Sequence, residues 1–150
     1  MLRGLLLSLT IAGTLGVTSG CAVNRATAMV TPDADLSKVK TFYVVQLSSD
    51  TRGVEKLIRD NLIKRGFTAT AGPELPQASY QADAVVTYLD KWFWDITMYM
   101  LELTITIRNP ANNFPMATGN SFHTSLTRKS PEEMVDEVLT NIFNNPQAKK

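Results

Sequence analysis

The chain has 150 residues, 15 basic and 14 acidic side chains, and a formal net charge of +1. This length predicts one folded domain, and the balanced charge gives no electrostatic reason to expect a nucleic acid as a partner. Cys21 is the only cysteine, which excludes an intramolecular disulfide and leaves either an odd thiol or a modified one.

The amino terminus has the order of a secretory signal peptide. Residues 1–3 give a short positively charged start, residues 4–17 are apolar and uncharged, and small residues follow at 18–20, directly before Cys21. The apolar run of about 14 residues is shorter than the roughly 18–20 that span a bilayer, so a permanent transmembrane helix is the weaker alternative. We predict a signal peptide over 1–20 with cleavage between Gly20 and Cys21.

Ser19-Gly20-Cys21 resembles the lipobox of bacterial lipoproteins, in which a small residue precedes the modified cysteine. Thr18 stands where that family usually has Leu. The resemblance implies a diacylglycerol on the Cys21 sulfur and a further acyl chain, such as palmitate, on its freed amine; several chains together anchor a protein stably. Ala22 replaces the Asp that retains such proteins at the inner membrane, so the resemblance implies the periplasmic face of the outer membrane.

The first half of the chain predicts a tether, a strand, a helix and a second strand. Residues 21–37 have no period and read as the lipidated terminus and a flexible tether. Residues 41–47 are aromatic and β-branched, which predicts a buried strand. Apolar residues at helical spacing, with capping residues before them and Gly66 after them, predict a helix over 51–65. Residues 67–70 predict a short strand that could run parallel to the first.

The second half predicts three further strands and one helix. A loop with two prolines over 71–81 leads to a strand over 82–91, and residues 101–108 alternate strictly between apolar and polar. After the turn cluster at 109–113, residues 114–126 predict a weaker strand whose Gly119 fits a bulge. Ser130-Pro131-Glu132-Glu133 has the pattern of a capping box and starts a helix that ends at 144–146, before a disordered tail over 146–150.

This order, β-α-β-β-β-β-α over residues 38–145, predicts an α+β two-layer sandwich. Two amphipathic helices need a common surface on which to bury their apolar stripes. We expect them on one face of a mixed, mostly antiparallel sheet whose other face is partly solvated.

The layout resembles a group of small, uncharacterised envelope lipoproteins. The features that carry the resemblance are the segments Asp35–Phe42, Lys64–Phe67 and Ala82–Val86. The arrangement is also similar to the lipopolysaccharide-assembly lipoprotein and to the amino-terminal domain of TolB-type proteins. The resemblance implies a role in assembly or scaffolding, and it carries over no catalytic residue.

No pattern in the sequence predicts an enzyme, a metal site or a cofactor other than the covalent lipid. His123 is the only histidine and has no neighbouring ligand motif, so we expect a strand side chain on a half-exposed face. Asp90 and Asp95 flank an aromatic run and could in principle act as an acid–base pair. The more ordinary interpretation is that these carboxylates are solvated or pair with Lys91.

The unusual feature is the aromatic run of residues 92–100, near the expected hairpin turn. Trp92 and Trp94 should share one face of an extended strand and Phe93 the other. One interpretation is that one face joins the core and the other lies under the 71–81 loop. The functional interpretation is a partner-binding patch that includes Trp92, Phe93, Trp94 and Tyr99.

The leading hypothesis is therefore a non-enzymatic lipoprotein that is anchored to the membrane and binds or scaffolds an envelope protein. The contact would use the aromatic run or an open sheet edge. The alternative is a binding module for a small ligand, a glycan or a lipid, with the tryptophans as its platform. The sequence leaves the oligomeric state open.

Overall fold

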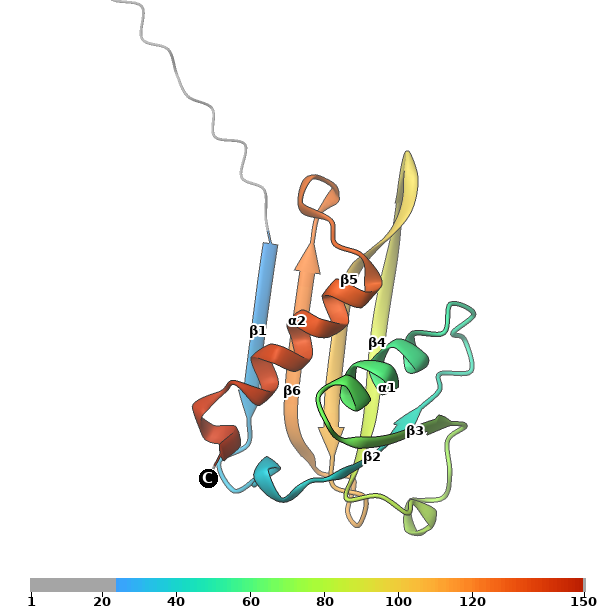
Figure 1. The fold of residues 1–150 in the computed structure, drawn as a ribbon. Helices are drawn as coiled ribbons and strands as arrows, with labels where there is room; N and C mark the ends of the chain where they lie inside the picture. The colour runs from blue at the N-terminus through green and yellow to red at the C-terminus, as the bar shows by residue number, and fades with distance from the viewer. Residues whose placement is uncertain (1–23, 150) are drawn as a thin grey trace, which may run out of the picture.

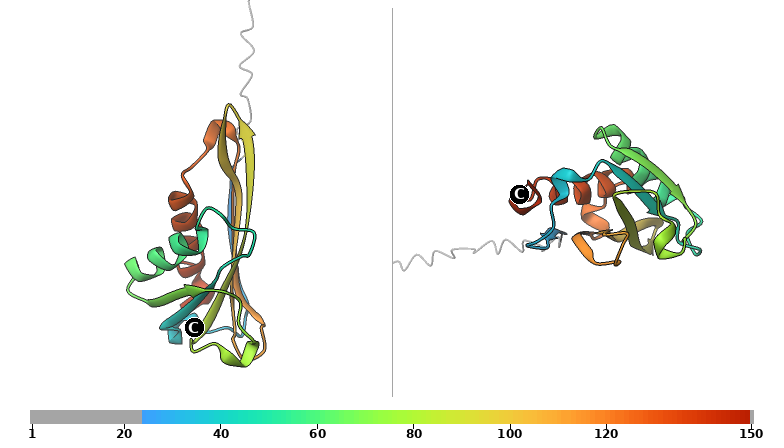
Figure 2. Two further views of the ribbon diagram at one scale, coloured as in Figure 1. Left: turned by 90° about the vertical axis from the view of Figure 1, so that its right-hand side faces the viewer. Right: turned by 90° about the horizontal axis from the view of Figure 1, so that it is seen from below.

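The computed structural model describes residues 24–149 (Figure 1). The predicted signal peptide, its cleavage site at Gly20 and the lipidation site at Cys21 lie outside these residues. The described chain has the expected α+β architecture, in which two helices pack on one face of a six-stranded mixed sheet (Figure 2). The observed order has one strand more than predicted, at the amino-terminal end.

The sheet has the spatial order β1-β6-β5-β4-β2-β3. β2 runs parallel to both β3 and β4, whereas the β4–β5, β5–β6 and β1–β6 pairs are antiparallel. The strands are β1 (Asn24–Val30), β2 (Thr41–Val45), β3 (Thr68–Gly72), β4 (Ala84–Asp95), β5 (Thr97–Arg108) and β6 (Pro115–His123). The helices are α1 (Val54–Lys64) and α2 (Pro131–Phe143), with short 3-10 turns at Leu36–Lys38, Gln77–Ser79, Ser125–Thr127 and Pro146–Lys149.

Helix α1 forms for the reasons that the sequence indicated. The Asp50 carboxylate accepts hydrogen bonds from the backbone N–H groups of Arg52, Gly53 and Val54, at 2.7, 3.0 and 2.8 Å. The bond to Val54 satisfies a donor that the start of the helix leaves without a partner, and the other two hold the turn that leads into it. Gly66, at φ 91°, ends the helix in the left-handed conformation. The prediction of a helix in this region is confirmed, with its start three residues later than expected.

The strand predicted over 101–108 is confirmed, and it lies inside the sheet between β6 and β4. Leu103, Ile105 and Ile107 of β5 are fully buried under the helices, and the polar residues between them face the other side. Helix α2 begins with the predicted capping box, in which Ser130 and Glu133 each accept a hydrogen bond from the other's backbone N–H. Its buried face completes the core with Met134, Val135, Val138, Leu139 and Ile142.

The sequence suggested a bulge at Gly119, but the structure has none there. Gly119 pairs in regular register with Ile105. A β-carbon at this position would lie 2.8 Å from Val138 Cγ1 and 3.0 Å from Ile142 Cγ1. The glycine is therefore required by the close approach of α2 to β6.

Both ends of the described chain are more ordered than predicted. Residues 24–30, expected in the tether, form β1 and pair with β6 along its whole length from Asn24–His123 to Val30–Ala117. Val30, at the end of that strand, is buried in the core. The tail expected from residue 146 forms a 3-10 turn, and Ala148 is also buried. Long-range packing gives these segments an order that their own sequence does not specify.

Candidate functional site

Strands β4 and β5 extend beyond the rest of the sheet as a two-stranded ribbon. β6 pairs with β5 only from Glu102 to Arg108, and β2 pairs with β4 only from Ala84 to Val86. Among the described strands, residues 92–100 therefore pair only with each other. We call the segment Trp92–Met100 the aromatic ribbon; it forms the upper end of the long hairpin in Figure 1. A hairpin without neighbouring strands is of marginal stability in water, so side-chain contacts must support it.

The register of the hairpin sorts the aromatic residues onto two faces. Trp92 lies opposite Met100 and Trp94 opposite Met98, so these pairs share one face. Phe93 lies opposite Tyr99 on the other face, with ring centroids 6.1 Å apart. The prediction that the two tryptophans share a face is confirmed.

The four residues predicted to contact a partner differ in exposure. Trp94 is 66% exposed and Phe93 52%, Trp92 is half-buried, and Tyr99 is only 7% exposed. Phe93 and Trp94 are thus available at the surface, whereas Tyr99 packs inside. That the exposed pair binds a partner stays a prediction.

Two arginines from distant loops support the aromatic ribbon. The Arg52 guanidinium lies 4.3 Å from the centroid of the Trp92 ring, and that of Arg128 lies 4.7 Å from the centroid of Tyr99. Arg128 also donates to the Thr97 hydroxyl at 2.7 Å. Such cation–π contacts attract the guanidinium to the face of the ring and so help to hold both rings in place. Neither arginine can be recognised from the sequence, because nothing local marks a contact between segments so far apart.

The loop after β3 does not cover the aromatic run, so that interpretation is wrong. The loop lies at the other end of the sheet (Figure 1), where Gln77 Nε2 donates to the carbonyl of Ala111 at 2.7 Å. The Tyr80 ring of this loop lies 5.2 Å from the Tyr43 ring. The 71–81 loop therefore covers neither face of the aromatic ribbon.

His123 is on a strand, as expected, but it is buried rather than half-exposed. Its Nε2 lies 2.7 Å from Glu137 Oε2, and the Ser121 hydroxyl donates to the same oxygen at 2.6 Å. Lys129 donates to Glu137 Oε1. Burial raises the pKa of Glu137, but the hydrogen bonds from Lys129, Ser121 and His123 outweigh it and lower that pKa to about 2.

This cluster joins β6 to α2 and does not have the geometry of a nucleophilic site. In a serine triad the imidazole lies between the hydroxyl and the carboxylate and accepts the hydroxyl proton. Here the hydroxyl of Ser121 and the imidazole of His123 both contact the carboxylate directly. The arrangement supports a structural role for His123.

The two carboxylates that flank the aromatic run have different surroundings. Asp90 accepts a hydrogen bond from Trp92 Nε1, and Asp95 lies beside the turn of the hairpin. Lys91, expected as their partner, instead forms an ion pair with Glu102 at 2.7 Å. In the described part of the chain no three His, Cys, Asp or Glu side chains gather in a way that could hold a metal ion.

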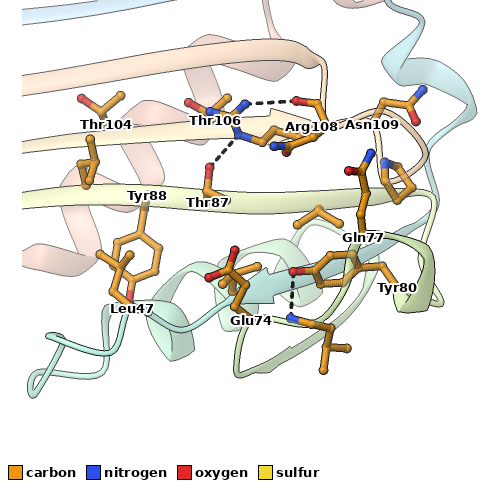
Figure 3. A pocket seen from close by; sticks show the side chains of 16 residues that line it. Leu47, Glu74, Gln77, Tyr80, Thr87, Tyr88, Thr104, Thr106, Arg108 and Asn109 are labelled. Carbon is orange, nitrogen blue, oxygen red and sulfur yellow. Dashed lines mark hydrogen bonds between the residues drawn. The ribbon is translucent and has the colours of Figure 1, made fainter.

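A cavity of about 440 Å³ lies on the sheet face opposite the helices (Figure 3). Arg108 lines it and donates to the Thr87 hydroxyl at 3.1 Å and to the Asn113 carbonyl at 3.2 Å. Glu74 and Tyr80, from the loop after β3, line its other side. Neither tryptophan lines this cavity, so a small ligand bound there would not use them as a platform.

No helix among residues 24–149 has the length and apolar character to cross a membrane. No protein-family model matches the chain, and no curated protein does.

The fold is similar to that of two solved structures. One is a PelC dodecamer from Paraburkholderia phytofirmans, 13% identical, with a TM-score of 0.61 over 80% of this chain and 98% of that one. The other is a dodecamer of a PelC variant from the same organism, 12% identical, with a TM-score of 0.58 over 85% of this chain and 100% of that one. At such low identity the likeness concerns the fold alone, and this is a fold that another protein assembles into a twelve-membered oligomer.

Proposed function

We propose that this protein is a non-enzymatic bacterial lipoprotein, anchored through Cys21 at the periplasmic face of the outer membrane. In this proposal it works as a scaffold: copies of the chain associate with each other and present a common surface to an envelope protein partner. The observation that carries the proposal is that both outer strands of the sheet have edges without the usual protection against pairing.

The edge formed by β1 is long and regular. Its seven residues pair with β6 without a register shift, and no described strand lies on their other side. Natural edge strands are usually protected by lysine, proline or a bulge. β1 has none of these, and its one charged residue, Arg25, extends over the Phe122 ring. One carbonyl, that of Ala28, is covered by the Asn145 side chain at 3.3 Å.

The edge formed by β3 is the second open edge. Its sequence, Thr-Ala-Thr-Ala-Gly, has neither a charge nor a proline, and β3 pairs only with β2 among the described strands. Since β1 and β3 are different surfaces at opposite ends of one sheet, a contact between β1 of one copy and β3 of the next is heterologous. Contacts of this kind close into rings when the rotation between copies allows it. The dodecamers formed by the structurally similar PelC support this form of assembly.

Charges placed on the edges test the proposal. We expect the wild-type protein to be a closed oligomer by native mass spectrometry. Thr27→Lys with Met29→Lys on β1, or Thr68→Lys with Thr70→Lys on β3, should give monomers, because lysine at an edge opposes strand pairing. All four positions are exposed, so the variants should fold.

Ile63→Lys is the matched control, since Ile63 is an exposed apolar residue that lies on helix α1 and on neither edge strand. This variant should keep the oligomer. A monomeric wild-type protein would contradict self-association, and oligomers that survive both pairs of lysines would show that the contact lies elsewhere.

A second candidate function, binding of a small anionic or glycan ligand, is favoured by the cavity at Arg108. Among residues 24–148 no carboxylate forms an ion pair with this guanidinium, although Glu74 lines the same cavity. A planar guanidinium with free donors suits a carboxylate or hydroxyl-rich ligand. Arg108→Gln should abolish binding in a glycan screen if the cavity is the site, and should leave the oligomer unchanged.

A further inference from the structure

We infer that the aromatic ribbon inserts into the headgroup region of the same bilayer that holds the lipid on Cys21. This inference rests on the lipid anchor of the proposed function and adds a second membrane contact to it. The acyl chains alone would leave the domain free to rotate about its amino-terminal segment. Insertion of the ribbon would fix the orientation of the domain relative to the membrane.

The aromatic ribbon and the start of the described chain lie at the same end of the molecule. The register places Arg25 opposite Phe122, Phe122 opposite Glu102, and Glu102 opposite Lys91. These four residues form one row across four strands, and Arg25 and Lys91 both form ion pairs with Glu102. From this row, the chain runs from Arg25 back to Asn24 in the same direction as β4 runs toward its turn, so the start of β1 and the ribbon lie at the same end of the sheet (Figure 1).

The two membrane contacts can therefore reach one plane. From Lys91 to Ile96 the hairpin rises five residues, or about 17 Å at about 3.4 Å per residue. Cys21 is four residues before Arg25 and can lie at most about 14 Å beyond it in the same direction. A bilayer surface that meets the lipidated cysteine is within reach of the ribbon tip.

Exposed apolar side chains gather at this end. Nine large apolar side chains are exposed in the described chain, and five of them lie on the aromatic ribbon or in the adjacent turn after β6. Those five are Phe93, Trp94, Ile96, Met98 and Leu126. Exposed apolar side chains that cluster at one end of a molecule, here on both faces of the hairpin, indicate a binding surface, whereas single exposed apolar residues do not. The other four are separated over β1, α1, the middle of β4 and the turn before β6.

The turn of the hairpin has an apolar residue where turn chemistry favours a polar one. Ile96 has φ 60° and is 86% exposed. A positive φ is costly for a β-branched side chain, and such positions usually have Gly or Asn. The other sharp hairpin of the sheet follows that rule, with Asn113 at φ 58°. An exposed isoleucine in a strained turn is explained if its side chain is buried in a lipid bilayer when the protein is bound to the membrane.

The residues around the tip suit the boundary between headgroups and acyl chains. Tryptophan and tyrosine are typical of that boundary because each has an apolar body and a polar group. Arg52 and Arg128, which stack on Trp92 and Tyr99, form no ion pair within residues 24–148. Their charges are free to meet lipid phosphates when the ribbon is inserted.

The two tryptophans of the chain are both in the ribbon, so intrinsic fluorescence reports on it directly. The experiment uses the full chain with Trp92→Phe, purified from bacterial membranes and reconstituted into phosphatidylcholine–phosphatidylglycerol vesicles. We expect Trp94 emission to be quenched about twofold or more when the phosphatidylcholine is brominated in its acyl chains, as for tryptophan at a membrane interface. Phe93→Ser in this background should weaken the quenching. Phe114→Ser, which removes an equally exposed phenylalanine from the far end of the sheet, should not.

Two further measurements distinguish the lipid anchor from the insertion of the ribbon. Flotation shows whether the protein is bound to the vesicles, and mass spectrometry of the peptide that contains Cys21 shows whether it is lipidated. A lipidated protein that floats with vesicles but shows no quenching overturns the insertion and leaves the anchor intact. A protein without lipid refutes the anchor; quenching by added vesicles would then support the ribbon by itself, and its absence would overturn both. Trp94 emission that is already blue-shifted without lipid, and is not quenched by it, would place the ribbon between copies of the chain and overturn the insertion.

Discussion

Glu137 shows how one half-buried side chain can join two elements of this fold. Its carboxylate lies on α2 and accepts hydrogen bonds from Ser121 on β6 and from Lys129 before the helix, and it contacts His123. These partners stabilise the ionised form, so the pKa of Glu137 is about 2 in the folded protein, against an ordinary value of 4.5. A carboxyl group with a depressed pKa stabilises the fold fully above its unfolded pKa, and this stabilisation is lost as the pH falls toward the folded pKa.

The first prediction concerns this residue. Glu137→Gln should lower the free energy of unfolding by about 1–3 kcal/mol at neutral pH, because a charged acceptor for buried donors is lost. The difference from wild type should shrink between pH ~4.5 and ~2, as the wild-type carboxylate is protonated. Urea denaturation across this pH range checks both statements. Glu132→Gln, an exposed glutamate on the same helix, serves as the control and should have little effect; a pH-independent difference would refute the role of the charge.

At the scale of elements, the position of α2 depends on the absence of a side chain. Gly119 lets the helix approach β6 more closely than any other residue would allow. The same helix carries the Glu137 contacts and follows the segment that positions Arg128 against the aromatic ribbon. A displacement of α2 should therefore change the packing at the aromatic ribbon as well as in the core.

Gly119→Ala tests this dependence. The added methyl group should cost about 1–3 kcal/mol in unfolding free energy, the usual cost of overpacking a core. Thr118→Ala, on the opposite face of β6, should cost less because it introduces no contact with α2. Thermal denaturation followed by circular dichroism measures both variants, and a Gly119→Ala protein as stable as wild type would show that the helix can move away at no cost.

The sequence could predict elements that are specified by their own residues. Helix α1, the capped start of α2 and the alternation of β5 depend on local spacing and capping, and all three were located. β1 could not be predicted, because its small residues become a strand only when β6 lies beside them. The turn of the long hairpin is expected near residues 92–100, but the sequence does not fix its position, because Ile96 has none of the chemistry by which turns are recognised.

The candidate site was predicted in the same partial way. The two faces of the aromatic run follow from the period of a strand, and the structure confirms them. Its exposure depends on how far β6 and β2 extend beside the hairpin, which is a property of the whole sheet. For the same reason a lone histidine in the sequence gave no sign that His123 would be buried against Glu137.

At the scale of the whole molecule, we expect membrane anchoring through the proposed lipid and folding of the domain to be independent of each other. Cys21→Ser should leave the domain folded, because Cys21 precedes the first residue of the sheet. The variant should be released from membranes, since the ribbon alone gives a weaker attachment than several acyl chains. Fractionation with immunoblotting measures the release, and circular dichroism confirms the fold; membrane retention equal to wild type would show that the lipid is not the main anchor.

The pairing of β1 with β6 also sets the order in which the chain can fold. β1 is the first of the described strands to be synthesised, yet its partner is the last of them. Contacts between segments so distant in sequence form late, because a long loop must close before they contribute. β1 thus stays without its partner, and accessible, until β6 has been synthesised. Under the proposed function, the lipid can therefore be attached to Cys21 before β1 pairs with β6, and this pairing then joins the modified terminus to the finished domain.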